Sequence, residues 1–403
     1  MKYIEGGVCA AKGFRAGGIH CGIRKNRTKR DLALIASDVR AAAAAVYTTN
    51  KVYGAPITVT RENIADGYAQ AVIVNSGNAN TCNANGIEIA KGMCGLVERY
   101  AGIAASDVVV ASTGVIGQQM SLDPIASGMP ALVAALGKNH ADAAEAIMTT
   151  DTVPKEAAVE FTVGGRTAHI GGMAKGSGMI HPNMATLLVF ITSDVAISPK
   201  MLKNALSEDV KDTFNMVSID GDTSTNDTCA VLSNGLAGNA EITAPGADYE
   251  AFRAALHAVT EKLCIMIAKD GEGATKLITC RVTGAKDEQN AKLAAKSIVC
   301  SSLVKAAMFG ADANWGRELC ALGYSGAEMD VSKIGVAFRS RKGTILVCEN
   351  GVGVDFSEDD AKIILSEDEI DILVTFGDGN AAATAWGCDL TYDYVKINGD
   401  YRT

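Results

Sequence analysis

One threonine in the middle of the chain is placed where its hydroxyl could act as a nucleophile. Residues 173–194 put a Gly-rich turn, Lys175-Gly-Ser-Gly178, and a proline before Thr186, which opens a run of β-forming residues. If the Thr186 hydroxyl adds to the Ala185 carbonyl and the ester hydrolyses, Thr186 keeps a free α-amine. The ordinary pKa of such an amine is about 7.7–8.0, so it could take the hydroxyl proton and activate its own residue. Residue type alone favours a plainer interpretation, a hydroxyl at the start of a buried strand.

Three other patterns resemble ligand-binding motifs, but each lacks a residue that the motif requires. Gly377-Asp-Gly379, between an expected strand and an expected helix, has the local dinucleotide pattern, but too little chain follows for the acidic residue that completes it. Residues 171–177 have the outer glycines of a phosphate loop, but Ser177 stands where the lysine is needed. Asp220-Gly-Asp222 begins like a calcium loop, but Thr225 replaces its turn glycine. We expect tight turns and no metal site.

Cysteine and histidine usage gives no catalytic or metal-binding cluster. The eleven cysteines are an odd number with no C-x-x-C pair, which is typical of reduced thiols in a cytosolic protein. The five histidines are widely spread, and neither a Ser-His-Asp set nor a G-x-S-x-G motif can be assembled from the sequence. We expect no cofactor.

Charge and hydropathy exclude several classes of protein. The net charge is −9, with only one short basic cluster at 24–30, which argues against a nucleic-acid partner. The longest apolar stretches, such as 184–191, are far shorter than the roughly 18 residues of a membrane-spanning helix. The first residues, Met-Lys-Tyr-Ile-Glu-Gly-Gly, lack the apolar segment of a signal peptide. We therefore expect a cytoplasmic protein with no membrane partner.

Strands and helices alternate along the chain, which predicts a mixed α/β fold. Short β-forming runs end in turn residues at 70–75, 108–112, 186–192 and 371–376. Helical spacing of apolar residues occurs at 125–136, 141–148, 200–211 and 249–264. With 403 residues, the length fits two or three domains or one large two-layer body. The weakest boundary falls near 284–287, before an Ala-rich helical stretch.

The segment before Thr186 resembles a known family. Lys-Gly-Ser-Gly-Met-Ile-His-Pro-Asn-Met-Ala-Thr is similar to the self-cleavage segment of the ornithine acetyltransferases, also called glutamate N-acetyltransferases, of arginine biosynthesis. Further matches follow in family order along nearly the whole chain: Asn75-Ser-Gly-Asn-Ala-Asn80, Ser112-Thr-Gly-Val-Ile-Gly117, Met148-Thr-Thr-Asp-Thr152, Asp270-Gly-Glu-Gly-Ala-Thr-Lys276, Asn314-Trp-Gly-Arg317, Gly377-Asp-Gly379 and Asn398-Gly-Asp-Tyr-Arg-Thr403. Two departures are small: Leu187-Leu188 stands where many relatives have Met-Leu, and the residues after Asn80 vary.

The resemblance implies a proenzyme that cuts itself between Ala185 and Thr186. The α-chain would be residues 1–185 and the β-chain residues 186–403, with a smaller C-terminal α/β unit at about 285–403. Two of each chain would form a heterotetramer. Thr186 would accept acetyl from N2-acetylornithine and pass it to glutamate in a ping-pong cycle. Some relatives also use acetyl-CoA as donor; no residue decides this, and we expect the bifunctional type.

Roles for individual residues follow from the same resemblance. Thr113 and Gly114 match the donors that stabilise the oxyanion, although residue type alone suggests a turn after a strand. An ammonium suits an amino-acid carboxylate and a carboxylate suits the amine of ornithine, but which group Lys175 and Glu272 each meet stays open. The full set of implied substrate-binding residues is Thr152, Lys175, Thr186, Glu272, Asn398 and Thr403.

The implied fold is the layered αββα-type sandwich of the self-cleaving aminopeptidase and ornithine acetyltransferase group. Two alternatives to acetyl transfer remain open. One is an amidase or aminopeptidase of the same group, in which water replaces glutamate as acceptor. The other is a non-catalytic amino-acid-binding protein, whose chain would stay intact.

Overall fold

Strands from the first 233 residues of the chain form a nine-stranded mixed sheet. The computed structural model describes residues 1–24, 29–181 and 187–399, and every structural statement below concerns these residues. Among them the order of the first sheet is β1-β6-β7-β8-β10-β3-β4-β5, with β2 paired to β3. The strands are β1 (Lys2–Tyr3), β2 (Phe14–Ile19), β3 (Leu32–Tyr47), β4 (Tyr68–Asn78), β5 (Val108–Val115), β6 (Lys155–Val163), β7 (Arg166–Lys175), β8 (Leu188–Ser193) and β10 (Thr228–Ser233).

The long strand β3 folds this sheet onto itself. Its pairing with β4 is interrupted between Ala36 and Ala41, and the residues at the interruption, Asp38 to Arg40, are exposed. The first half of β3 pairs with β2 and β4, and its second half pairs with β10. One hydrophobic core contains apolar side chains of β4 and β5 together with those of β8 and β10, so the two halves face each other as layers.

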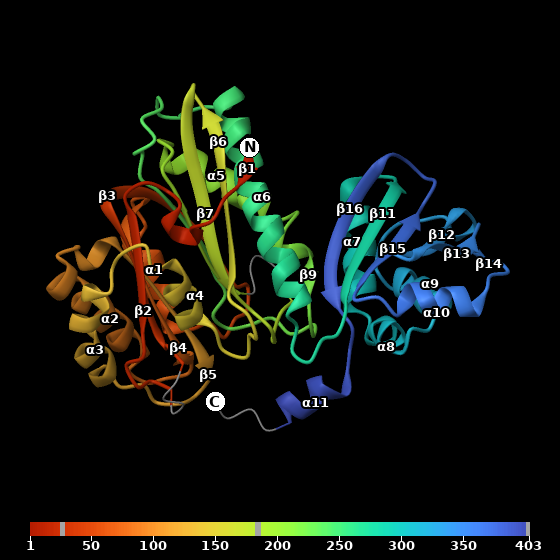
Figure 1. The fold of residues 1–403 in the computed structure, drawn as a ribbon, viewed down its shortest axis with the longest axis horizontal. Coiled ribbons are helices and arrows are strands. Elements are labelled where there is room, and N and C mark those ends of the chain that lie inside the picture. Colours follow the sequence, from red (N-terminus) through yellow and green to blue (C-terminus); the bar gives the residue numbers. More distant parts are fainter. Residues whose placement is uncertain (25–28, 182–186, 400–403) are drawn as a thin grey trace.

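Helices cover the outer face of each layer. The helices α1 (Ala55–Asn63), α2 (Gly86–Ala101) and α3 (Asp123–Ala134) bury their apolar sides against β3, β4 and β5. The helices α5 (Pro199–Asp209) and α6 (Ala247–Lys269) cover the other layer. The short helix α4 (His140–Ile147) instead packs against β2 and β3 and adds its apolar side chains to the core between the layers. Figure 1 shows these helices on both sides of the strands. The expected layered αββα sandwich is therefore confirmed.

A second, seven-stranded sheet forms the other lobe in Figure 1. Its order is β14-β13-β12-β15-β11-β16-β9, and helices α7 and α9 belong to its core. The elements are β9 (Val217–Ser218), β11 (Leu277–Ala285), β12 (Gly335–Ser340), β13 (Gly343–Glu349), β14 (Val352–Gly353), β15 (Glu369–Thr375), β16 (Ala381–Cys388), α7 (Glu288–Cys300), α8 (Ser302–Gly310), α9 (Trp315–Gly323) and α10 (Glu358–Leu365). The last helix, α11 (Tyr392–Asn398), follows the lobe. Because β9 and all of β11 except its last residue precede residue 285, this lobe takes in strand residues that lie before the expected start of the C-terminal unit.

One local expectation is wrong. Gly377-Asp-Gly379 follows strand β15 as expected, but strand β16 comes next and not a helix. Gly377 has a φ of 70°, and a Cβ on Gly379 would lie 2.4 Å from the Ala285 carbonyl oxygen. The glycines therefore make a tight strand-to-strand turn, because a side chain at either position would be strained or would collide with backbone.

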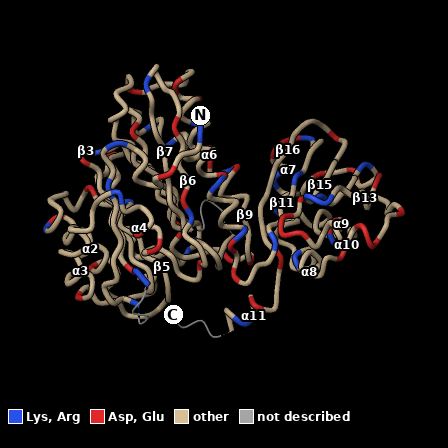
Figure 2. Tube along the Cα trace, in the orientation of Figure 1, with Lys and Arg blue, Asp and Glu red and all other residues tan. Residues whose placement is uncertain are grey.

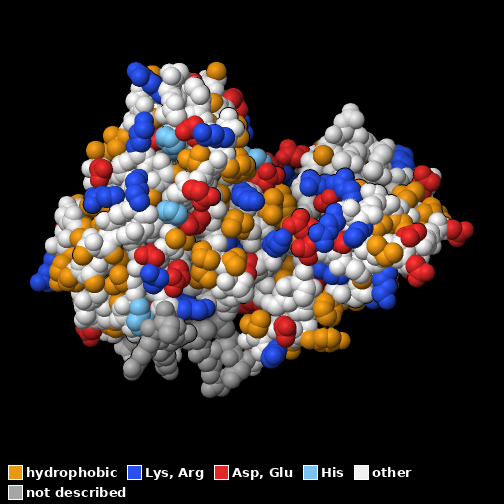
Figure 3. Space-filling model, viewed as in Figure 1, with side chains coloured by type: hydrophobic (Ala, Val, Ile, Leu, Met, Phe, Trp, Pro, Cys, Tyr) orange, Lys and Arg blue, Asp and Glu red, His pale blue; other side chains and the backbone are white. Residues whose placement is uncertain are grey.

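Other global features agree with the composition. All eleven cysteines are free, as expected for reduced thiols. Within the described part of the chain no single helix is long and apolar enough to span a membrane, and α7 and α8 pass that test only together, across a 58° bend. Basic and acidic residues are interspersed along both lobes (Figure 2), and the face shown in Figure 3 has mixed patches of both signs.

Candidate active site

A cavity of about 110 Å³ opens at one edge of the sandwich, where the ends of both sheet layers meet. Five predicted site residues line it together: Thr113, Gly114, Lys175, Glu272 and Asn398. They come from β5, from β7, from the loop between α6 and β11, and from α11. The fold thus brings together residues separated by almost 300 positions in the sequence.

Thr113 and Gly114 lie at the end of β5, beside the parallel strand β4. Gly114 pairs with Gly77, has a φ of 128°, and a Cβ there would lie 2.3 Å from the Gly77 carbonyl carbon. Only glycine fits this close backbone approach. Thr113 is nearly buried, and its hydroxyl has no hydrogen-bond partner among the described residues. Its hydroxyl therefore remains available to donate to an oxyanion in the cavity.

Lys175 is the last residue of β7 and a nearly buried cation of the cavity wall. It pairs with Leu188 in the antiparallel ladder of β7 and β8. No acidic group of the described chain lies within ion-pair distance of its ammonium. Burial lowers the pKa of Lys175, and the charges of Asp151, Asp227 and Glu272 act in the opposite direction. The site thus holds a cation that is ready to meet a carboxylate.

Glu272 provides the carboxylate of the same cavity. Its Oε2 accepts a hydrogen bond of 2.6 Å from Asn398 Nδ2, and the side chain is almost fully buried. A Cβ on Gly178 would lie 2.2 to 2.5 Å from the Glu272 carboxyl group, so the glycine allows this approach. The opposite charges of Glu272 and Lys175 suit a ligand with both an ammonium and a carboxylate.

The C-terminal helix α11 reaches this site as a separate arm, which Figure 1 shows apart from the second lobe. Thr391 Oγ1 donates to the Gly273 carbonyl at 2.7 Å, and the Tyr394 hydroxyl hydrogen-bonds to Asp220 at 3.3 Å. A Cβ on Gly273 would meet the Tyr394 backbone nitrogen at 2.8 Å. These contacts place Asn398 at the cavity. Thr403 lies outside the described residues.

Thr152 does not line the cavity. Its backbone N–H and its hydroxyl both donate to the Asp270 carboxylate, the N–H at 3.1 Å from Oδ2. The neighbouring Thr149 and Thr150 line the cavity in its place. The Met148-Thr-Thr-Asp-Thr152 segment therefore belongs to the site, with Thr152 on its outer side.

Ala185 and Thr186 lie outside the described residues, and part of the chain before them lines the cavity. On one side, Gly178 and Met179 line it, and Ile180 bridges to Thr223. On the other side, the Leu187 carbonyl accepts a hydrogen bond of 2.9 Å from Thr228 N.

The sequence did not single out the segment 224–227 as part of a site. Asn226 lines the cavity and joins the two sheet layers, because its Nδ2 donates to the Ala79 and Ser112 carbonyls at 2.5 and 3.0 Å. Asp227 is buried, its Oδ2 has no hydrogen-bond partner among the residues that the structure describes, and burial raises its pKa well above the usual range. The sequence signal that could have pointed to this segment is the Asp220-Gly-Asp222 motif just before it, which we interpreted only as an incomplete calcium-loop pattern.

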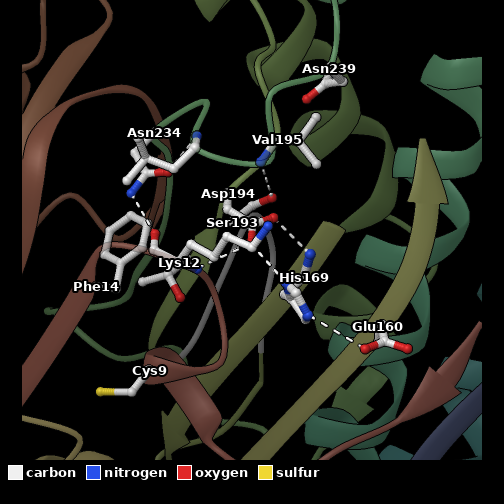
Figure 4. A network of polar contacts seen from close by, with 12 residues as sticks. Cys9, Lys12, Phe14, Glu160, His169, Ser193, Asp194, Val195, Asn234 and Asn239 are labelled. Carbon is white, nitrogen blue, oxygen red and sulfur yellow. Dashed lines mark hydrogen bonds and ion pairs between the residues drawn. The ribbon is translucent and has the colours of Figure 1, made fainter. Parts of the chain in front are cut away.

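A second polar network, drawn in Figure 4, lies at the folded edge of the sandwich, far from the cavity along the strands. His169 near the start of β7 contacts Asp194 beyond the end of β8 at 2.8 Å and Glu160 at 3.6 Å. Asn234 Nδ2 donates to the Lys12 carbonyl at 2.9 Å. The imidazole thus links two acids and no nucleophile, so this network has a structural role.

The layered fold and a cavity with paired charges and a glycine-bordered hydroxyl define an enzyme of the acyl-transfer class. The pattern of the ArgJ family matches residues 15–403, and the chain belongs to this family. An arginine biosynthesis bifunctional protein ArgJ from Caldanaerobacter subterraneus is 49% identical over the whole of both chains, and that of Symbiobacterium thermophilum is 51% identical over the same extent.

A solved structure agrees with this assignment. The arginine biosynthesis bifunctional protein ArgJ of Bacillus halodurans is 47% identical, with a TM-score of 0.50. The match covers 52% of this chain and 97% of that one. The expected family is therefore confirmed, and the chain is an enzyme of arginine biosynthesis. The amidase and the non-catalytic binding protein are not favoured.

Proposed function

We propose that this enzyme transfers acetyl from N2-acetylornithine to glutamate through an acetyl ester on Thr186. The observation that carries the proposal is the meeting of Thr113, Gly114, Lys175 and Glu272 in one small cavity. The neutral α-amine of Thr186 takes the hydroxyl proton while Oγ attacks the acetyl carbon. The hydroxyl of Thr113 and the backbone at Gly114 stabilise the tetrahedral oxyanion. Collapse breaks the amide bond, and the proton goes to the leaving amine of ornithine.

The second half of the cycle reverses these steps with another amine. Neutral glutamate amine attacks the acetyl ester, the same oxyanion forms, and Thr186 Oγ leaves with a proton from its α-amine. Lys175 is the partner for the substrate carboxylate, and Glu272 is the partner for the ornithine ammonium, because each meets the opposite charge in a site largely shielded from water.

The proenzyme cut between Ala185 and Thr186 is part of this proposal. The B. halodurans chain is matched almost completely, yet it covers only 52% of this chain, so it is about half as long. Residues 186–403 make up about 54% of the sequence, which supports a cut near the middle. A heterotetramer of two α-chains and two β-chains, a C-terminal unit at about 285–403 and a cytoplasmic location belong to the same proposal.

The test supplies purified protein with N2-acetylornithine and glutamate. We expect N-acetylglutamate and ornithine in equal amounts. Free acetate in place of N-acetylglutamate would instead indicate an amidase, and an uncut, inactive chain would indicate a binding protein.

We also propose acetyl-CoA as a second donor and no bound cofactor. The names of the relatives include the word bifunctional, which supports a second activity. Acetyl-CoA and glutamate at millimolar concentration should then give N-acetylglutamate. A result with no product would remove this branch and leave the ornithine reaction in place.

A further inference from the structure

Three buried charges lie directly behind the cavity wall. Lys155, the first residue of β6, is fully buried, and its ammonium lies 2.7 Å from Asp151 Oδ1 and 2.5 Å from Asp270 Oδ2. The Asp151 side chain is fully buried, and that of Asp270 is 8% exposed. None of the three residues lines the cavity. We call this cluster, Asp151, Lys155 and Asp270, the ion triplet.

Each carboxylate of the ion triplet also accepts backbone hydrogen bonds from a segment that contributes residues to the cavity. Asp151 accepts hydrogen bonds from Gly176 N at 2.7 Å and from Thr149 N at 3.0 Å. Asp270 accepts from the backbone and the hydroxyl of Thr152. Charge-assisted hydrogen bonds of this kind are short and about twice as strong as neutral ones.

The backbone of Asp270 extends the connection to the segments of Lys175 and Glu272. Its carbonyl accepts a hydrogen bond of 2.6 Å from Ser177 Oγ, and the Ser177 carbonyl accepts one of 2.8 Å from Glu272 N. The ion triplet therefore joins the three segments 149–155, 175–178 and 270–272. These segments contribute Thr149, Lys175 and Glu272 to the cavity.

The cost of such a cluster indicates a role beyond stability. Burying a charged group costs several kcal/mol, and well-packed apolar side chains of similar volume are often as stable or more so. Apolar side chains could not accept hydrogen bonds from Gly176, Thr149 and Thr152, and they could not place a negative charge near Lys175. The geometry is consistent with a negative charge near Lys175, because Asp151 accepts a hydrogen bond from Gly176, the residue directly after Lys175.

Four ionisable groups act on the Lys175 ammonium. They are Asp151, Asp227 and Glu272, which favour its charged form when they are ionised, and Lys155, which disfavours it. Burial raises the pKa of Asp151, but Lys155 and Lys175 more than offset this and hold it below the usual range. Asp151 thus stays ionised next to Lys175, whereas burial favours the neutral form of Asp227.

We propose that Asp151 and Asp270, held by Lys155, are positioning residues of the substrate site. Asp270 fixes the 149–152 segment, and Asp151 fixes the turn after Lys175 and keeps its ammonium charged for the substrate carboxylate. This inference rests on the proposed function, because it takes Lys175 to be the contact of the amino-acid carboxylate.

The test measures glutamate and ornithine binding by calorimetry from about pH 7 to about pH 10, a range in which a buried lysine titrates. It compares the unmodified protein with Asp151→Asn, Asp270→Asn and the control Asp209→Asn. Asp209 is a buried carboxylate on α5 that contacts His257 at 2.9 Å, away from the cavity. All four proteins are first checked by thermal unfolding.

We expect Asp270→Asn to weaken both ligands about tenfold at every pH, because the 149–152 segment loses its anchor. Asp151→Asn should move the pH at which glutamate binding is lost down by about one unit, because Lys175 loses a neighbouring negative charge. Asp209→Asn should bind like the unmodified protein. For Asp151, a purely structural role would weaken glutamate binding without moving the pH midpoint.

Outcomes that contradict the inference are distinct from failure of the proposed function. If the unmodified protein binds neither ligand, the proposed function fails. If it binds, and Asp151→Asn retains the same pH midpoint, the inference is wrong. If Asp151→Asn does not fold, Asp270→Asn still tests the inference, because Lys155 and Asp151 remain paired in that variant with no net charge. Unchanged affinity of Asp270→Asn for both ligands would overturn the inference.

Discussion

Lys175 and Leu188 face each other across the antiparallel ladder of β7 and β8. This pairing places a buried cation beside the strand that begins two residues after Thr186. The same edge of the sandwich has Thr113 and Gly114 at the end of β5. The chemistry proposed for Thr186 therefore has both a partner for the substrate carboxylate and donors for an oxyanion close to the chain that follows it.

Thr186→Ala removes the hydroxyl required for both self-cleavage and acetyl transfer. We expect a single uncut chain with no transfer activity, seen by denaturing gel and by an assay for N-acetylglutamate. Thr186→Ser is the matched control, since it keeps a hydroxyl and should still be cut. Two fragments from the alanine variant would show that another residue makes the cut.

Lys175→Met keeps the length of the side chain and removes its charge. We expect glutamate to bind about 100-fold more weakly, because a charge-assisted contact in a nearly buried site is lost. Titration calorimetry measures this directly. Lys138→Met is the control: Lys138 donates to the Cys9 carbonyl at 2.7 Å near the folded edge of the sandwich, so its loss should leave binding unchanged. Equal affinities for the Lys175 variant and the unmodified protein would remove Lys175 from the site.

Gly114→Ala introduces a Cβ that would collide with the Gly77 carbonyl carbon. We expect kcat to fall by about 10² to 10³, because the backbone that stabilises the oxyanion must shift. Gly117→Ala separates collision from backbone strain: Gly117 also has a positive φ, 74°, but no atom lies within 4 Å of its Cβ position. That variant should lose only about 1 kcal/mol of stability. Similar kcat values for the two variants would argue against the close approach as the cause.

Glu318 on α9 should make the stability of the folded protein depend on pH. It is fully buried, neither carboxyl oxygen has a hydrogen-bond partner in the described part of the chain, and burial raises its pKa to about 8. Because the folded pKa lies above the unfolded one, its contribution is fully present below about pH 4.5 and is lost as the pH rises to about 8. Glu318→Gln should flatten the fall of Tm over this range. A fall of equal size in both proteins would mean that Glu318 is not its source.

Local elements could be predicted from the sequence because they depend on nearby residues. The strand expected at 108–112 is found in β5, and the helix expected at 249–264 is found in α6. The strand expected at 186–192 is found as β8 from Leu188 onward, while Thr186 lies outside the described residues. The turn at Gly377 was recognised, but the element after it was wrong, because alanine-rich β16 is a strand only through its pairing with β11 and β9.

The arrangement of the site could not be predicted from spacing alone. Thr113 and Glu272 meet only because β3 folds the sheet onto itself, and nothing local in the sequence of Asp38 to Arg40 announces that fold. The resemblance supplied five of the cavity residues. It gave no role to Asn226 or to the ion triplet, because those roles depend on hydrogen bonds between distant segments. Thr152, an implied substrate contact, hydrogen-bonds to Asp270 in the structure.

The most direct test of the nucleophile is the intact mass of the denatured protein after incubation with N2-acetylornithine and no glutamate. We expect two fragments, with the larger one starting Thr-Leu-Leu-Val and carrying one acetyl group on the Thr186 oxygen. The acetyl group should disappear when glutamate is added. A single uncut chain, or two fragments of which neither gains an acetyl group, would contradict the account.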